Sequence, residues 1–192
     1  MPDMESLMNN FLHDLVDITT INANIIVDLR YATENNFTKK KIYTGARCFL
    51  RAAVAKKIDA IQKELETIGL GLKIWDGYRP LSAQRFLWAI MPDERYVMDP
   101  AKGSKHNRGS AVDLTLVDKQ GNELLMPTGF DDFTEKAYGD YKALPQEAID
   151  NRELLKNIMV KYNFIPQPAE WWHFDDGNWK GYQILDIDIE NL

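Results

Sequence analysis

The chain has 192 residues, of which 45% are hydrophobic and 27% are charged, and it contains 11 glycines and 8 prolines. This composition is typical of one soluble globular domain and excludes collagen-like, coiled-coil and disordered chains. The 29 acidic and 23 basic residues give a net charge of −6, which argues against a nucleic-acid partner because such partners need a basic face.

From the sequence we expect no disulfide, no membrane span and no signal peptide. Its single cysteine, Cys48, excludes an internal disulfide. No window approaches 18 uncharged apolar residues, so we expect no transmembrane helix. Asp3 and Glu5 stand where a signal peptide would carry basic residues. We therefore expect a cytoplasmic protein, or a periplasmic one if a leader has been removed.

The first half of the chain predicts a strand and a long helix. We expect a short N-terminal segment over residues 1–24, followed by one domain over residues 25–192. Alternating apolar residues over 25–31 predict a half-buried strand. Apolar residues three and four apart predict a helix over 47–68, with Cys48 near its start.

The second half predicts an alternation of strands and helices. We expect strands over 72–75, 111–117, 171–174 and 182–187, and a helix over 81–90 with Pro80 in its first turn. Asp150 and Glu153 form a capping-box pattern that predicts a helix over 150–162. The order β-α-β-α-β-α-β-β favours a mixed α+β domain over a regular doubly wound sheet.

Two of the three histidines lie in unusual sequence surroundings. His106 and Asp113 fall in the segment Ser-Lys-His-Asn-Arg-Gly-Ser-Ala-Val-Asp, and His173 ends the segment Glu-Trp-Trp-His. Three nitrogen or oxygen ligands with water in the fourth position are typical of a catalytic zinc, whereas a closed structural site would need a fourth ligand and usually cysteines. Zinc lowers the pKa of a bound water toward about 7, and a nearby carboxylate can then move the proton.

Glu170 is our candidate for that general base. In a regular strand, residues three apart point to opposite faces, so Glu170 and His173 can converge only if Glu170 lies in a turn or bulge. Pro168 makes an irregular strand entrance plausible. Gly109 would similarly let the backbone turn so that His106 and Asp113 converge.

Each of these residues alone also has a simpler explanation. A lone histidine in an aromatic strand is usually packed, Asp113 could be a cap or turn partner, and Arg79 could be a surface residue after the Asp76-Gly77 turn. Tryptophans are more often core than substrate platforms, which applies to Trp171, Trp172 and Trp179. His13 has no companion, so we expect it to be structural or exposed.

The pattern Ser-x-His-x-x-Gly-Ser-Ala-x-Asp over 104–113, followed by Glu-x-Trp-His over 170–173, resembles the zinc D-alanyl-D-alanine dipeptidases of the vancomycin-resistance type, within the zinc D,D-peptidases. Further blocks follow the family's order from about residue 27 to 185: Tyr-Ala-Thr over 31–33, Asn-Phe-Thr over 36–38, Trp-Asp-Gly-Tyr-Arg-Pro over 75–80 and Phe-Asp over 130–131. The resemblance implies a single α+β domain with a mixed, mainly antiparallel sheet packed with helices, the zinc D,D-peptidase (hedgehog-like) fold.

The resemblance also implies roles for eight residues. One Zn²⁺ per chain would be held by His106, Asp113 and His173. Glu170 would be the general base, and Arg79 would stabilise the oxyanion. The expected contacts with the substrate ends are Ser104, Asp131 and Tyr31, with Asp131 facing the free ammonium of a small dipeptide. The implied activity is hydrolysis of D-Ala-D-Ala to two D-alanines.

One residue departs from the family pattern. Lys39 stands where we expect a glycine after Asn-Phe-Thr, and a side chain there would change the loop if that glycine had a positive φ. The shape of this loop, and access to the pocket, therefore depend on how Lys39 is accommodated.

Three other functions stay open from the sequence. The same metal site could serve a peptidoglycan D,D- or L,D-carboxypeptidase, which would need an open cleft and export. A non-catalytic zinc-binding recognition module could dispense with Glu170 and Arg79. A metal-free packed domain would contain no stoichiometric zinc. The oligomeric state cannot be read from this sequence.

Overall fold

The computed structural model describes residues 14–192 of the chain, so His13 lies outside the described residues. Its main element is a five-stranded sheet with the strand order β2-β4-β5-β7-β6. These strands are β2 (Ile26–Val27), β4 (Leu70–Asp76), β5 (Ala111–Asp118), β6 (Phe164–Gln167) and β7 (Glu170–Asp176). β2 and β4 are parallel and the other neighbours are antiparallel, which confirms the predicted α+β class with a mixed, mainly antiparallel sheet.

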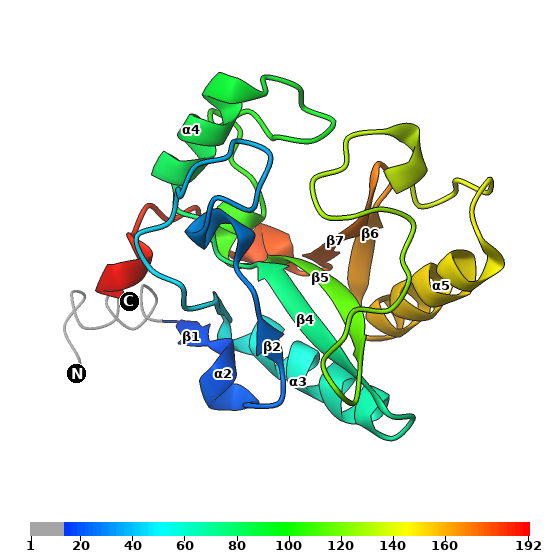
Figure 1. Cartoon of the computed structure of the whole chain (residues 1–192). Coiled ribbons are helices and arrows are strands. Elements are labelled where there is room, and N and C mark those ends of the chain that lie inside the picture. Colours follow the sequence, from blue (N-terminus) through cyan, green and yellow to red (C-terminus); the bar gives the residue numbers. More distant parts are fainter. Residues whose placement is uncertain (1–13) are drawn as a thin grey trace.

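Three longer helices accompany the sheet: α3 (Ala52–Glu66), α4 (Leu81–Ile90) and α5 (Gln146–Lys161). In Figure 1, α3 and α5 lie below the sheet, whereas α4 and the long loops lie above it. The strand β5 is buried along nearly its whole length. Because successive strand residues point to opposite faces, Val112, Leu114 and Leu116 enter the core while Asp113 faces the other side.

A two-stranded sheet pairs β1 (Leu15–Asp17) with β3 (Phe49–Arg51), and a short helix, α2 (Ile18–Ile21), follows β1. These elements contact α3, so the described part of the N-terminal segment packs against the rest of the protein. The division of the chain at residue 25 stays a prediction.

Several predicted elements match the structure closely. The helix over 81–90 coincides with α4, and β4 and β5 contain the strands predicted over 72–75 and 111–117. β7 contains the strand predicted over 171–174. Trp171 and Trp172 are core residues, as expected, while Trp179 is only half-buried.

Other predictions need correction. The strand predicted over 25–31 shrinks to β2, because the chain turns into a 3₁₀ helix, η1 (Arg30–Ala32), in which Tyr31 is still buried. The long helix begins at Ala52 rather than at residue 47, since residues 49–51 pair with β1, and Cys48 is a buried residue ahead of that strand.

The C-terminal half also differs in two places. α5 begins at Gln146, so Asp150 does not cap it. β6 was not predicted, and residues 182–187 form no strand; the backbone N–H of Leu185 donates instead to the carbonyl of Asn107. Among the described residues, no helix combines the length and apolar character that a membrane crossing requires.

Candidate active site

The register of three neighbouring strands brings polar side chains into one row. Asp76 at the end of β4 pairs with Asp113 of β5, and Asp113 pairs with His173 of β7. His106 joins this row from a short 3₁₀ helix, η2 (His106–Arg108), which ends at Gly109 with a φ of +67°. The expected turn at Gly109 is therefore present, since a left-handed conformation is easiest for glycine.

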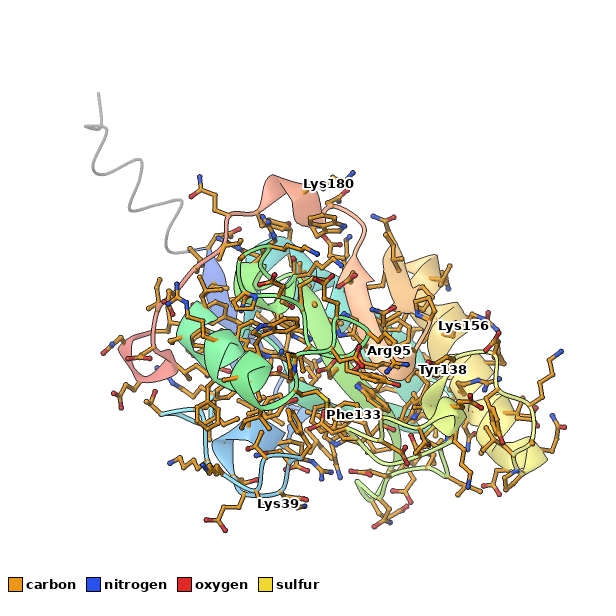
Figure 2. All side chains as sticks on the ribbon, turned by 90° about the horizontal axis from the view of Figure 1, so that it is seen from above. Lys39, Arg95, Phe133, Tyr138, Lys156 and Lys180 are labelled. Atoms are coloured by element: carbon orange, nitrogen blue, oxygen red, sulfur yellow. The ribbon has the colours of Figure 1, made fainter. Side chains whose placement is uncertain are left out.

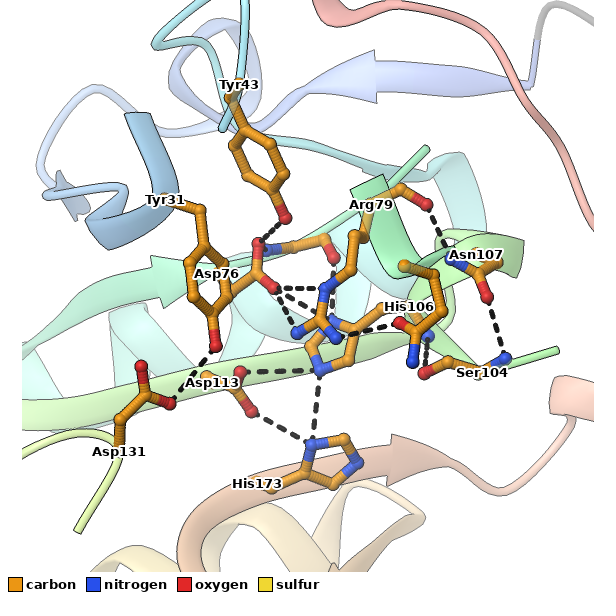
Figure 3. Close-up of polar contacts among 12 residues, drawn as sticks. Tyr31, Tyr43, Asp76, Arg79, Ser104, His106, Asn107, Asp113, Asp131 and His173 are labelled. Carbon is orange, nitrogen blue, oxygen red and sulfur yellow. Dashed lines mark hydrogen bonds and ion pairs between the residues drawn. The ribbon is translucent and has the colours of Figure 1, made fainter. Parts of the chain in front are cut away.

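His106, Asp113 and His173 meet closely (Figure 3). His173 Nδ1 lies 2.9 Å from Asp113 Oδ1 and 3.2 Å from His106 Nε2. His106 Nε2 lies 3.4 Å from Asp113 Oδ2. All three potential ligand atoms lie within 4.8 Å of one another, so the trio could hold a metal ion.

The remaining nitrogen of each histidine has a partner that fixes the ring. His106 Nδ1 lies 2.7 Å from the carbonyl oxygen of Gly77, which can only accept, so Nδ1 carries the proton and Nε2 is free to ligate. His173 Nε2 lies 2.9 Å from Asp175 Oδ1, which leaves Nδ1 facing the trio. Such outer hydrogen bonds orient histidine ligands in metal sites. The donor set of two imidazoles and one carboxylate fits zinc.

Asp113 is ready to act as a ligand. It is buried, which opposes ionisation, but His106 and His173 hold the pKa of its carboxyl well below the usual range. A deprotonated carboxylate is the form that binds a cation.

Glu170 reaches the same site through a β-bulge. It is the first residue of β7, and the pairing with β6 passes from Phe174 opposite Pro166 to Glu170 opposite Gln167. Glu170 Oε2 lies 4.0 Å from His173 Nδ1, so the predicted irregular strand entrance is confirmed. Burial raises the pKa of Glu170 to about 8; His173 lowers it, and the charges of Asp113 and Asp131 raise it.

Arg79 follows β4 and is held by two neighbours. Its Nε and Nη2 donate to Asp76 Oδ2 at 3.1 and 2.7 Å, and its Nη1 donates to Gln84 Oε1 at 2.9 Å. The guanidinium also lies 5.1 Å from the ring centre of Tyr31. Arg79 is only 6% exposed, so it is not the surface residue that the simpler interpretation would make it.

Tyr31 and Asp131 form a hydrogen-bonded pair in the same site. The Tyr31 hydroxyl donates to Asp131 Oδ1 at 3.1 Å, while Asp131 Oδ2 is buried without a hydrogen-bond partner. Burial, followed by the charge of Asp113, raises the pKa of Asp131 to about 7. Asp131 has a φ of +57°, a conformation that is uncommon outside glycine, so this loop holds its carboxylate at some conformational cost.

Ser104 lies beside His106. Its hydroxyl oxygen accepts a hydrogen bond from the backbone N–H of His106 at 3.2 Å, which leaves the hydroxyl hydrogen available for donation.

All eight residues singled out in the sequence line one cavity of about 40 Å³. The segments around 94–98 and around residue 133 contribute to its lining. The Tyr96 hydroxyl donates to the backbone carbonyl of Phe133 at 3.0 Å, and the centres of the two rings lie 4.7 Å apart. Figure 2 labels Arg95 and Phe133, one from each of these segments. Most of the side chains that line it are polar or charged.

The sequence did not single out Asp175, Gln84 or Tyr43, whose hydroxyl donates to Asp76 Oδ1 at 2.6 Å. Asp175 carried a signal, because it lies two residues after His173 in a strand and so shares its face. Gln84 and Tyr43 gave no such indication, because their side-chain contacts join different elements of the fold. Lys39 holds a φ of +56°, so it adopts the left-handed conformation that a glycine would take there.

Along most of its length, the chain is similar to known proteins of one family. A family model described as D-ala-D-ala dipeptidase matches residues 12–187. The D-alanyl-D-alanine dipeptidase of Escherichia coli is 42% identical over 176 residues, which cover 90% of this chain and 89% of that protein. The protein of the same name from Enterococcus faecalis is 34% identical, over 77% of this chain and 83% of that one.

Among solved structures, the LdcB LD-carboxypeptidase aligns with 88% of this chain and 70% of its own, at 18% identity and a TM-score of 0.49. That similarity is too low to carry an argument about activity.

Proposed function

Because the chain belongs to the D-Ala-D-Ala dipeptidase family, we propose that it hydrolyses D-Ala-D-Ala to two D-alanines at a single zinc ion held by His106, Asp113 and His173. The observation that carries this proposal is the cavity itself. A buried ligand trio, a buried carboxyl, a buried guanidinium and an unpaired carboxylate oxygen all face one small space.

Zinc in this position would activate water and polarise the peptide carbonyl. His106 and His173 would each present one lone pair, because Gly77 and Asp175 engage their other nitrogens. Asp113 would contribute its carboxylate from the strand between them.

Glu170 would take the proton from the attacking water and deliver it to the departing amine as the C–N bond breaks. The position of Glu170 supports this role. Its carboxyl group is buried, and its Oε2 lies 4.0 Å from Nδ1 of His173, the nitrogen that faces the metal site. A general base must lie within reach of the water whose proton it takes.

Arg79 would donate to the carbonyl oxygen as negative charge develops on it. The guanidinium has five N–H bonds, and Asp76 and Gln84 engage three of them. One hydrogen on each terminal nitrogen remains, and Arg79 lines the cavity. Donors already fixed at the position where charge develops typically lower a barrier by about 3 to 4 kcal/mol.

The two ends of the substrate would be recognised by Asp131 and Ser104. Asp131 Oδ2 lacks a partner and would pair with the free ammonium, while Tyr31 holds the other carboxylate oxygen. Ser104 would donate its hydroxyl hydrogen to the opposite end. An N-acylated substrate would leave Asp131 Oδ2 buried and unpaired, which disfavours longer chains.

The test is D-alanine release by the zinc-loaded protein from D-Ala-D-Ala, with N-acetyl-D-Ala-D-Ala and L-Ala-L-Ala in parallel. We expect cleavage of the free D,D-dipeptide alone. Cleavage of the acylated compound would instead favour a carboxypeptidase. If zinc binds stoichiometrically and all three compounds stay intact, the protein is a recognition module and the proposal is wrong. A protein that binds no zinc would be the metal-free domain.

A further inference from the structure

Gln84 is a fully buried amide in the middle of the helix α4. Its side chain joins two parts of the cavity wall. Oε1 accepts from Arg79 Nη1 at 2.9 Å, and Nε2 donates to the backbone carbonyl of Met98 at 2.7 Å. Arg79 can only donate and a carbonyl can only accept, so the amide satisfies both neighbours in one orientation only. The bond to Met98 therefore aims Oε1 at Arg79.

Asp76 alone leaves the guanidinium incompletely fixed. Both of its bonds to Arg79 end on the same oxygen, Oδ2, because Tyr43 and the backbone N–H of Gly77 bind Oδ1. A guanidinium held through one acceptor atom can still pivot about that atom. Gln84 accepts a hydrogen bond from a different nitrogen, Nη1, so the guanidinium is held by two side chains.

We infer that Gln84 is a positioning residue for Arg79: its amide oxygen fixes the guanidinium so that one free N–H on each terminal nitrogen is available to the reacting carbonyl oxygen. This inference rests on the proposed function. It adds a residue outside the eight singled out above and explains why a polar side chain is completely buried in α4. A displacement of about 1 Å in a stabilising group can cost about 100-fold in rate, so fixing Arg79 beforehand has a measurable value.

The test is a double-mutant cycle built from Gln84→Met and Arg79→Ala. Methionine keeps the volume and length of the side chain but offers Arg79 only a weak sulfur acceptor. We expect Gln84→Met to lower kcat by about 10- to 100-fold with KM changed by less than about threefold, because Arg79 would act on the transition state. In the Arg79→Ala background, Gln84→Met should change kcat by less than about twofold.

Gln62→Met is the matched control. Gln62 is also a buried helical glutamine; its amide accepts from the backbone N–H of Leu72 at 2.8 Å, away from the cavity. This variant should lower the melting temperature while leaving kcat within about twofold of wild type. A second variant, Gln84→Glu, keeps the acceptor for Arg79 and loses the donor to Met98, so its kcat should lie closer to wild type than that of Gln84→Met.

The possible outcomes separate the explanations. If Gln84→Met slows the enzyme equally with and without Arg79, Gln84 acts through the Met98 segment and the inference is wrong. A slow Arg79→Ala enzyme beside a Gln84→Met enzyme of wild-type kcat would also overturn it, while leaving the proposed function intact. An Arg79→Ala enzyme of wild-type kcat would overturn the oxyanion role and, with it, the inference.

Discussion

Asp113, Glu170 and Asp131 all line the cavity, and each carboxyl group meets a different environment. Asp113 contacts both histidines and stays ionised, whereas burial raises the pKa of Glu170 and of Asp131. Carboxyl groups with separated pKa values in one site are typical of a division between charge stabilisation and proton transfer. At the scale of single residues, these different environments therefore support a ligand role for Asp113 and a proton-transfer role for Glu170.

Replacing Glu170 should separate chemistry from metal binding. Glu170→Gln should lower kcat by at least about 100-fold, because the amide cannot take the proton, and it should retain stoichiometric zinc. His173→Ala should lose both zinc and turnover, since it removes one of three ligands. Metal analysis and D-alanine release measured on the same preparations check both statements. Retained turnover in Glu170→Gln would remove this residue from the mechanism.

Asp131 should make stability depend on pH. Its carboxyl has a folded pKa of about 7, above its value of about 4 in an unfolded chain, so the folded protein binds the proton more tightly. The stability that this group contributes is fully present below pH 4 and is lost as the pH rises to about 7, by at most about 4 kcal/mol. In zinc-free protein, Asp131→Asn should therefore gain stability relative to wild type between pH 4 and pH 8.

Urea unfolding of both proteins across this range measures the difference. The same variant should bind D-Ala-D-Ala more weakly, because the neutral amide cannot pair with an ammonium. A stability difference that is independent of pH would show that Asp131 does not carry the raised pKa.

At the scale of elements, the site depends on irregularities in otherwise regular strands. The bulge at the start of β7 turns Glu170 toward His173, and the left-handed turn at Gly109 joins η2 to β5. A Cβ atom at Gly109 would lie 2.5 Å from Leu15 Cδ2 and 3.4 Å from the backbone nitrogen of Arg51. This turn is therefore tightly enclosed as well as left-handed.

Gly109→Ala should lower stability by about 1 to 3 kcal/mol and weaken zinc binding by at least about tenfold, because the strained turn displaces His106 relative to Asp113. Gly121→Ala is the control. Gly121 also has a positive φ, of +84°, and a Cβ there would lie 3.0 Å from Ile26 Cδ1. Thermal melting and competitive zinc titration should show both effects for Gly109→Ala but only the loss of stability for Gly121→Ala. Equal zinc affinity in the two variants would contradict this assignment.

These elements also explain what the sequence could and could not predict. α4 and β5 could be predicted from the sequence because the apolar pattern of each lies within one short segment. The start of α3 was wrong because the spacing continues through Leu50, whereas residues 49–51 pair with a strand more than thirty residues earlier in the chain. β6 contains Pro166, which argues against a central strand, and it is indeed an edge strand. Apolar and polar residues alternate over 182–187 as in a strand, but the backbone groups of this segment bond to separate partners. The backbone N–H of Ile187, for example, donates to the Tyr78 hydroxyl.

The site was predictable to the extent that its chemistry lies in short segments. His106 and Asp113 are seven residues apart, and Glu170 and His173 are three apart, so their grouping showed in the sequence. Gln84 did not show, because a glutamine in an amphipathic helix usually faces solvent and only the tertiary contact with Arg79 gives it a role. Residues that support a site from other elements are the part that sequence patterns miss.

At the scale of the whole molecule, the proposed zinc ion would join two parts of the chain that are far apart in the sequence, because His173 lies 60 residues after Asp113. Its ligands come from η2, β5 and β7, and the last two are neighbouring strands of the central sheet. In zinc-free protein, the two histidines and Asp113 have one another as polar partners. Burial opposes the charge on both Asp113 and His173. The metal should therefore stabilise the folded chain as well as serve the reaction.

Removing zinc with a chelator should lower the melting temperature, and adding zinc back should restore it. A ligand that binds only the folded state contributes about 4 kcal/mol at a free concentration 1,000 times its Kd, which for a chain of this length corresponds to a shift of about 8 to 16 °C. Differential scanning calorimetry at buffered free zinc measures this shift, and Asp113→Asn provides the control because it removes one ligand with little change in shape. Wild type should show a zinc-dependent shift that Asp113→Asn lacks, whereas Glu170→Gln should keep it. An equal shift in Asp113→Asn would mean that zinc stabilises the chain from some other site, and the trio would then no longer explain metal binding.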